Sequence, residues 1–207
     1  MLKDWVRREI LNQIEKQRKT GDLSIRLYRE EKEYAERNRL VPEEFKESAR
    51  FIELNSSSRF LEAHIERCEK ESDQLVAIED RSLLEQPVEF LKKHQKEYIY
   101  LESDWFDNIG VDAISLELDD VFKTYSVMLG LKLRKKAETA LKAKLNHALS
   151  GEMPKFSILY NRDDELWDVN FPLNNLRGFR ENMSIGEAYQ MIYGFLFNLV
   201  EDLAETE

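Results

Sequence analysis

The chain has 207 residues, of which 42% are hydrophobic and 11% aromatic, and its formal net charge is -10 at pH 7. This apolar content excludes a disordered acidic polypeptide, because such a chain lacks the apolar area that offsets the entropy lost on folding. No apolar run approaches the roughly 18 residues of a membrane span. Charges spread through residues 1–9 argue against a signal peptide, and the single cysteine, Cys68, indicates a reducing compartment. We therefore expect a cytoplasmic protein.

Residues 1–40 are expected to form an N-terminal helical arm. A stripe of apolar residues at a spacing of four predicts the first helix, and three further residues on one face predict a second helix after residue 22. Many charges surround these stripes, so we expect the arm to find a protein partner, most simply a second copy of the chain. The stripes consist of Leu2, Val6, Ile10 and Ile14, then Leu23, Leu27 and Tyr34.

Residues 41–150 are expected to form a helical bundle. Pro42 and the two glutamates after it resemble a helix start. A seven-residue repeat of apolar residues then predicts a long helix, and Pro87 begins or kinks the next one. Leucines and aromatic residues at three- and four-residue steps predict a last helix over residues 112–150. The seven-residue repeat is made of Leu54, Leu61, Cys68 and Leu75.

Residues 151–207 show a change of period that predicts a β-hairpin followed by a helix. Residues 156–160 and 165–171 are separated by a short polar turn, and the second strand places Trp167, Val169 and Phe171 on one face. Ser184 and Glu187 form a capping box that starts an apolar terminal helix. The hairpin should pack on that helix, either as a separate domain or joined to residues 41–150. The fold class expected is therefore α+β and predominantly α.

Basic charge is concentrated in one acidic-flanked stretch. Residues 121–150 carry 7 Lys/Arg against 1 Asp/Glu, whereas residues 41–120 carry 9 against 21. Such a stripe is typical of an electrostatic contact with an acidic surface, of this chain or of a partner, or of a phosphate-binding surface. On the predicted helix these residues project to solvent. The candidate basic face consists of Lys132, Arg134, Lys135, Lys136 and Lys142, with Lys144 nearer the apolar side.

Catalytic patterns are scarce in the sequence. The glycines are too widely spaced for a dinucleotide-binding turn or a Walker loop, and no nucleophile elbow is present. The Glu-x-x-His pattern of di-iron bundles is also missing. His64 and Cys68 form a weak candidate for half of a metal site, since two ligands spaced by four share one helix face. No cofactor is expected.

These observations favour a non-enzymatic cytoplasmic protein-interaction module, such as an adaptor, regulator or chaperone-like binder. Two alternatives stay open. One is a nucleic-acid-associated protein that uses the basic face of residues 132–144, and the other is a metal-dependent helical-bundle enzyme. The hairpin face of Trp167, Val169 and Phe171 is a further candidate for partner binding, if it is exposed rather than packed on the terminal helix.

Overall fold

The computed structural model describes residues 2–17, 23–151 and 155–204, and the chain divides into two compact units, residues 1–59 (unit 1) and 60–207 (unit 2). The expected segments 41–150 and 151–207 thus share unit 2 over most of their length. The prediction of a predominantly helical protein with a bundle is wrong. The described residues contain a seven-stranded and a two-stranded sheet, and the stretch expected to be the bundle supplies strands β2 to β7.

Unit 1 combines two helices with a parallel strand pair. Its elements are α1 (Leu2–Gln17), β1 (Leu23–Leu27), α2 (Arg29–Arg37) and β2 (Ala49–Glu53), with 3-10 turns at Glu43–Phe45 and Ser56–Ser58. The first predicted helix is confirmed, with Leu2, Val6, Ile10 and Ile14 all buried. The prediction of a second helix is wrong over residues 23–27. This stretch is a strand with alternately buried side chains, and it pairs with β2. The helix start expected after Pro42 is a single 3-10 turn.

A buried ion pair joins two parts of unit 1 that are distant in sequence. Arg59 donates to both carboxylate oxygens of Glu31, at 2.6 and 3.0 Å, and its side chain lies over the ring of Tyr28. The Arg59 side chain is 2% exposed and that of Glu31 is 0% exposed. Charge-assisted bidentate bonding offsets the cost of removing both groups from water.

Unit 2 is built on an antiparallel sheet with the strand order β4-β3-β5-β6-β7-β9-β8. The prediction of long helices in this part of the chain is wrong. The apolar repeats on which it was based run across several strands and the turns between them. Phe122, for example, belongs to an exposed turn between β6 and β7. The strands are β3 (His64–Glu69), β4 (Leu75–Glu79), β5 (Glu97–Glu102), β6 (Val111–Leu118), β7 (Tyr125–Leu131), β8 (Ser157–Asn161) and β9 (Leu166–Pro172).

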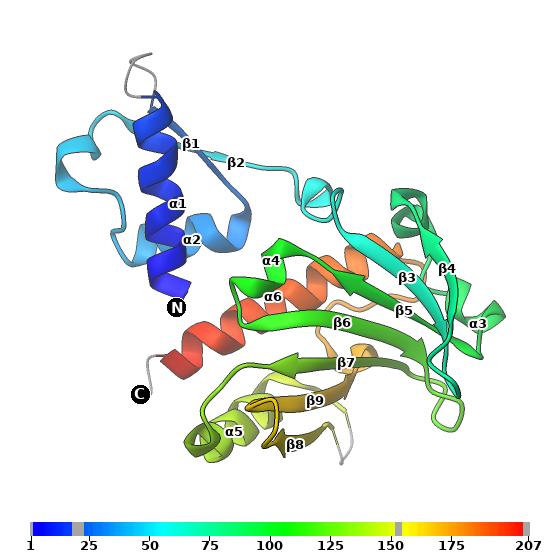
Figure 1. The fold of residues 1–207 in the computed structure, drawn as a ribbon. Helices are drawn as coiled ribbons and strands as arrows, with labels where there is room; N and C mark the ends of the chain where they lie inside the picture. The colour runs from blue at the N-terminus through cyan, green and yellow to red at the C-terminus, as the bar shows by residue number, and fades with distance from the viewer. Residues whose placement is uncertain (1, 18–22, 152–154, 205–207) are drawn as a thin grey trace. The chain divides into compact units, whose positions relative to one another are not determined.

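The long C-terminal helix α6 (Ile185–Ala204) lies against one face of this sheet (Figure 1). The expected capping box is confirmed: the backbone N–H of Glu187 donates to Ser184 Oγ, and that of Ser184 donates to the Glu187 carboxylate. The remaining helices are α3 (Phe90–Lys93), α4 (Asp104–Asp107) and α5 (Glu138–Ala148), with 3-10 turns at Arg81–Glu85, Lys135–Ala137 and Leu173–Asn175. Along the described residues, no helix has the length and apolar character needed to cross a bilayer.

The predicted hairpin is confirmed as β8 and β9. Trp167, Val169 and Phe171 are 2%, 1% and 0% exposed. The ring of Phe171 contacts that of Phe195 on α6, so this face of the hairpin packs toward the terminal helix as expected. Pairing of β9 with β7 adds the hairpin to the larger sheet, which the sequence pattern did not indicate.

Candidate functional site: the open face of the sheet

The side chains of the seven-stranded sheet that point away from α6 form a second face, which we call the open face. Strand alternation defines it: residues in register across the sheet share a side, and the α6 side holds the buried apolar residues. Many open-face side chains remain partly exposed. Its central members are Glu66, Cys68, Tyr98, Tyr100, Ser115, Glu117, Ser126, Met128, Gly130, Leu166, Asp168 and Asn170, with Leu159 on the outer strand β8.

A groove of about 670 Å³ is hollowed into the open face between β5 and β8. Tyr100, Met128 and Leu166 supply its apolar surface, and Leu159 at its outer side is 68% exposed. Gly130 explains part of its shape. A Cβ at this position would stand 3.1 Å from Leu166 Cδ2, so the missing side chain leaves room for Leu166 to lie across the floor.

The polar groups around the groove include both hydrogen-bond donors and hydrogen-bond acceptors. Burial raises the pKa of Tyr100, which therefore presents a protonated hydroxyl at neutral pH. Ser126 Oγ donates to Asn170 Oδ1 at 3.0 Å across β7 and β9. Asp112, Asp164 and Asp168 also line the groove, so its lining carries negative charge. A surface of this kind offers hydroxyl, amide and carboxylate groups among apolar contacts.

The weak metal candidate, His64 and Cys68, lies on a strand rather than on a helix. His64 Nε2 is 2.8 Å from Glu66 Oε1, and Cys68 Sγ is 3.8 Å from the other Glu66 oxygen. Among the described residues, no group of three or more His, Cys, Asp and Glu side chains has an arrangement that holds a metal ion. Burial, the largest influence, raises the pKa of the Cys68 thiol, which disfavours the nucleophilic thiolate at neutral pH.

The outer strand β4 carries an apolar row beside this part of the open face. Leu75, Val76 and Ile78 are 53%, 48% and 65% exposed. Ile78 pairs with Glu66 and Leu75 with Cys68, while a register shift leaves Val76 as an additional residue between them. Leu75 and Ile78 therefore extend the open face to the edge of the sheet, and the unpaired Val76 adds a third exposed apolar side chain to β4.

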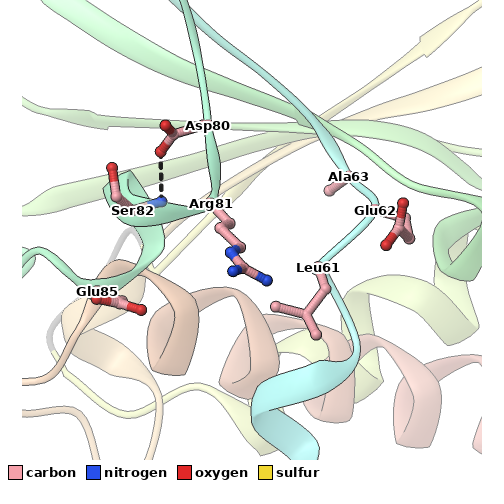
Figure 2. Close-up of a pocket in the computed structure, with 7 residues that line it drawn as sticks. All are labelled: Leu61, Glu62, Ala63, Asp80, Arg81, Ser82 and Glu85. Atoms are coloured by element: carbon pink, nitrogen blue, oxygen red, sulfur yellow. Dashed lines mark hydrogen bonds between the residues drawn. The ribbon is translucent and has the colours of Figure 1, made fainter.

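A second pocket, of about 470 Å³, lies where the chain leaves β4. Figure 2 shows Leu61, Glu62 and Ala63 from the segment before β3 on one side, and Asp80, Arg81, Ser82 and Glu85 on the other. Asp80 accepts a hydrogen bond from the backbone N–H of Ser82 at 2.7 Å. Three carboxylates against one guanidinium make this pocket acidic.

Searches against family models, curated proteins and solved structures gave no match.

The candidate basic face is divided among several elements. Lys132 follows β7, Arg134, Lys135 and Lys136 belong to the connection and the 3-10 turn after it, and Lys142 lies on α5. Lys132 pairs with Asp112, so one residue of the stripe does contact an acidic group within residues 41–120. Lys142 pairs with Glu138 at 2.6 Å.

Two further basic residues contact other parts of unit 2. Lys144 pairs with Asp202 of α6 at 3.0 Å, and Lys135 lies 5.8 Å from the ring centre of Tyr160. The stripe is therefore not one continuous face of one helix. Binding of nucleic acid stays a prediction that this arrangement does not favour.

The other predicted site, the aromatic face of Trp167, Val169 and Phe171, belongs to the core and is not available to a partner in the folded chain. The apolar stripe of α1 is likewise buried. Self-association through the N-terminal helices stays a prediction, but the exposed apolar seam that motivated it is not seen.

Sequence reasoning missed the open face. Its signal was present as alternation in β5 and β6, where Tyr98 and Tyr100 flank the buried Ile99, and Ser115 flanks the buried Ile114. Apolar spacings of three and four in the same stretches favoured helices instead.

Proposed function

We propose that this chain is a non-catalytic protein-interaction module that binds a partner polypeptide on the open face of its seven-stranded sheet. One observation carries the proposal: α6 covers one face of the sheet, while the other face holds a groove in which Leu159 is exposed and further apolar side chains are partly exposed among polar groups. Antiparallel sheets usually leave one face in water, but that face is then lined mainly by polar residues. An open face with Tyr100, Met128 and Leu159 has the mixture found in protein interfaces.

The chemistry of the open face supports binding rather than covalent catalysis. The raised pKa of Cys68 keeps its sulfur protonated, and the raised pKa values of Tyr98 and Tyr100 keep their hydroxyls neutral. Neutral tyrosines are well suited to recognition because they combine a large apolar ring with one hydrogen-bonding group. We place this activity in the cytoplasm, a proposal supported by the single free thiol.

A capture experiment with matched variants tests the proposal. The tagged full-length chain and two variants, Leu159→Lys in the groove and Ile52→Lys in unit 1, are used to capture proteins from the native host. Both positions are exposed, at 68% and 42%, so neither change should unfold the chain. A partner that the wild type and Ile52→Lys retain and that Leu159→Lys loses supports the proposal. Equal capture by all three proteins contradicts it.

A further inference from the structure

We propose that the edge strand β4 is an acceptor for strand addition, and that it binds an extended apolar segment with basic flanks from a partner protein. The inference rests on the proposed function, because it assumes a protein partner. It goes further in naming the strand that makes the main-chain contact and the chemistry of the segment that is bound.

The backbone of β4 is the first requirement. β4 is the outermost strand of the sheet, next to β3, and its other side has no neighbouring strand among the described residues. An edge strand presents a row of N–H and C=O groups that an extended peptide can pair with.

The side chains of β4 are the second requirement. Soluble proteins usually protect an edge with lysine, proline, inward-pointing charge or a β-bulge. β4 has a bulge at Val76, and Glu79 at its end is paired with Arg67 at 2.6 Å. Residues 75–78 carry no charge and no proline, and Leu75, Val76 and Ile78 are each about half exposed or more. A strand added beside β4 would cover these three side chains with its own alternate apolar residues.

The charge around β4 decides between two occupants, a second copy of the chain and a different protein. Carboxylates stand at both ends of the strand: Glu71 and Asp73 precede it, and Asp80 and Glu85 follow it. Arg81 is the basic residue nearest the second group, and Figure 2 shows it in the same pocket as Asp80 and Glu85. A second copy would bring like charges together, whereas lysine or arginine flanks on a foreign strand would meet opposite charges.

An exposed isoleucine of unit 1 provides a matched control. Ile78 on β4 and Ile52 on β2 are 65% and 42% exposed, and Ile52 belongs neither to β4 nor to the groove of the proposed function. Ile78→Lys gives β4 the protective charge that edge strands usually carry, and it repels a basic peptide. Ile52→Lys makes the same chemical change on a strand of the other sheet.

The probe is a synthetic peptide, KKTVTITVTKK, labelled at its N-terminus and titrated with the full-length protein at low and high salt. We expect saturable binding that weakens as salt rises. Ile78→Lys should weaken binding at least about tenfold, and Ile52→Lys should leave it within about twofold of wild type. Two control peptides, one with glutamate flanks and one with proline in the apolar part, should bind at least about tenfold more weakly than the probe.

Several results would overturn the inference. They are the absence of saturable binding at about 1 mM peptide, equal losses in both lysine variants, and equal binding of the acidic peptide. Light scattering that shows a dimer of the wild type and a monomer of Ile78→Lys would instead assign β4 to a second copy. Failure of the peptide to bind β4 can be distinguished from failure of the proposed function, because the dependence of the native partner on Leu159 is measured in the separate capture experiment.

Discussion

The hydroxyl of Tyr189 on α6 donates to the backbone carbonyl of Ile99 on β5 at 3.1 Å, and it also lies 3.4 Å from the carbonyl of Ile114 on β6. All three residues are 0% exposed. Burial raises the pKa of Tyr189, so the hydroxyl keeps its proton for this contact. The bond attaches the terminal helix to the middle of the sheet and so leaves the opposite face open.

Tyr189→Phe tests this attachment. The change removes the hydroxyl without opening a large cavity, and a typical buried hydrogen bond contributes about 0.5–1.5 kcal/mol to stability. We expect the free energy of unfolding, measured by urea denaturation, to fall by about that amount. Tyr160→Phe, at a less buried tyrosine, is the control. An unchanged denaturation midpoint for Tyr189→Phe would show that the hydroxyl does not hold the helix on the sheet.

The buried ion pair of unit 1 should be costly to break on one side. Arg59→Met leaves the Glu31 carboxylate buried without its guanidinium and also removes the 2.6 Å contact of Arg59 with Glu30. Breaking a buried pair on one side typically costs about 3–5 kcal/mol. Replacing Arg59 and Glu31 by Met should recover part of this loss, because the fully buried carboxylate is then gone while Glu30 still lacks Arg59. Arg29→Ala, which removes an exposed pair with Glu33, should barely move the midpoint. If the single and double variants were equally unstable, packing rather than charge would explain the loss.

Trp167 should be a stability residue rather than a binding residue. Trp167→Ala removes a large side chain from the core and should cost about 3–5 kcal/mol. Trp167→Phe is the informative control, because the indole Nε1 has no hydrogen-bond partner among the residues that the structure describes. That variant should keep more stability than Trp167→Ala, as it retains an aromatic ring and loses an unsatisfied N–H group. Near-native stability of Trp167→Ala would contradict the core assignment.

Cys68 should react slowly and with a shifted pH dependence. Because burial raises its pKa, the rate of alkylation by iodoacetamide should rise at a higher pH than in the urea-unfolded chain, where the thiol has a pKa of about 8.5. The folded state also holds this proton more tightly. The contribution of the Cys68 thiol to the free energy of unfolding is therefore fully present below the pKa of the unfolded chain. It is lost as the pH rises through the higher pKa of the folded state. Coincident pH profiles for the folded and unfolded chain would contradict this assignment.

Unit 2 should fold without unit 1. It has its own core, in which the ring of Phe60 contacts those of Phe106 and Tyr189. A fragment of residues 60–207 should therefore unfold cooperatively in a thermal melt followed by circular dichroism. Light scattering on the same fragment also tests the predicted self-association. A full-length mass above one chain, with a fragment mass of one chain, would assign that association to unit 1.

Signals confined to a few neighbouring residues were sufficient for several elements. The stripe of α1 repeats within one helix, and the capping box joins Ser184 to Glu187, three residues later. The hairpin shows alternation in two adjacent strands joined by a short turn. In each case the residues that specify the element also contact one another, so sequence spacing alone was enough to predict it.

The seven-stranded sheet could not be predicted in this way, because its strand pairs join segments that are distant in the sequence. Leu118, Tyr125 and Leu129 have helical spacing, yet a turn separates the first from the other two, and all three are buried in strands. Their burial becomes favourable only when β6 and β7 pair and distant segments pack on them, as Phe179 does on Tyr125. Pairing of Leu131 with Trp167 likewise joins strands that are distant in sequence. The sequence determined the local helices and the hairpin; only tertiary packing decided which face of the sheet α6 covers and which stays open, because each buried face needs partners from distant segments.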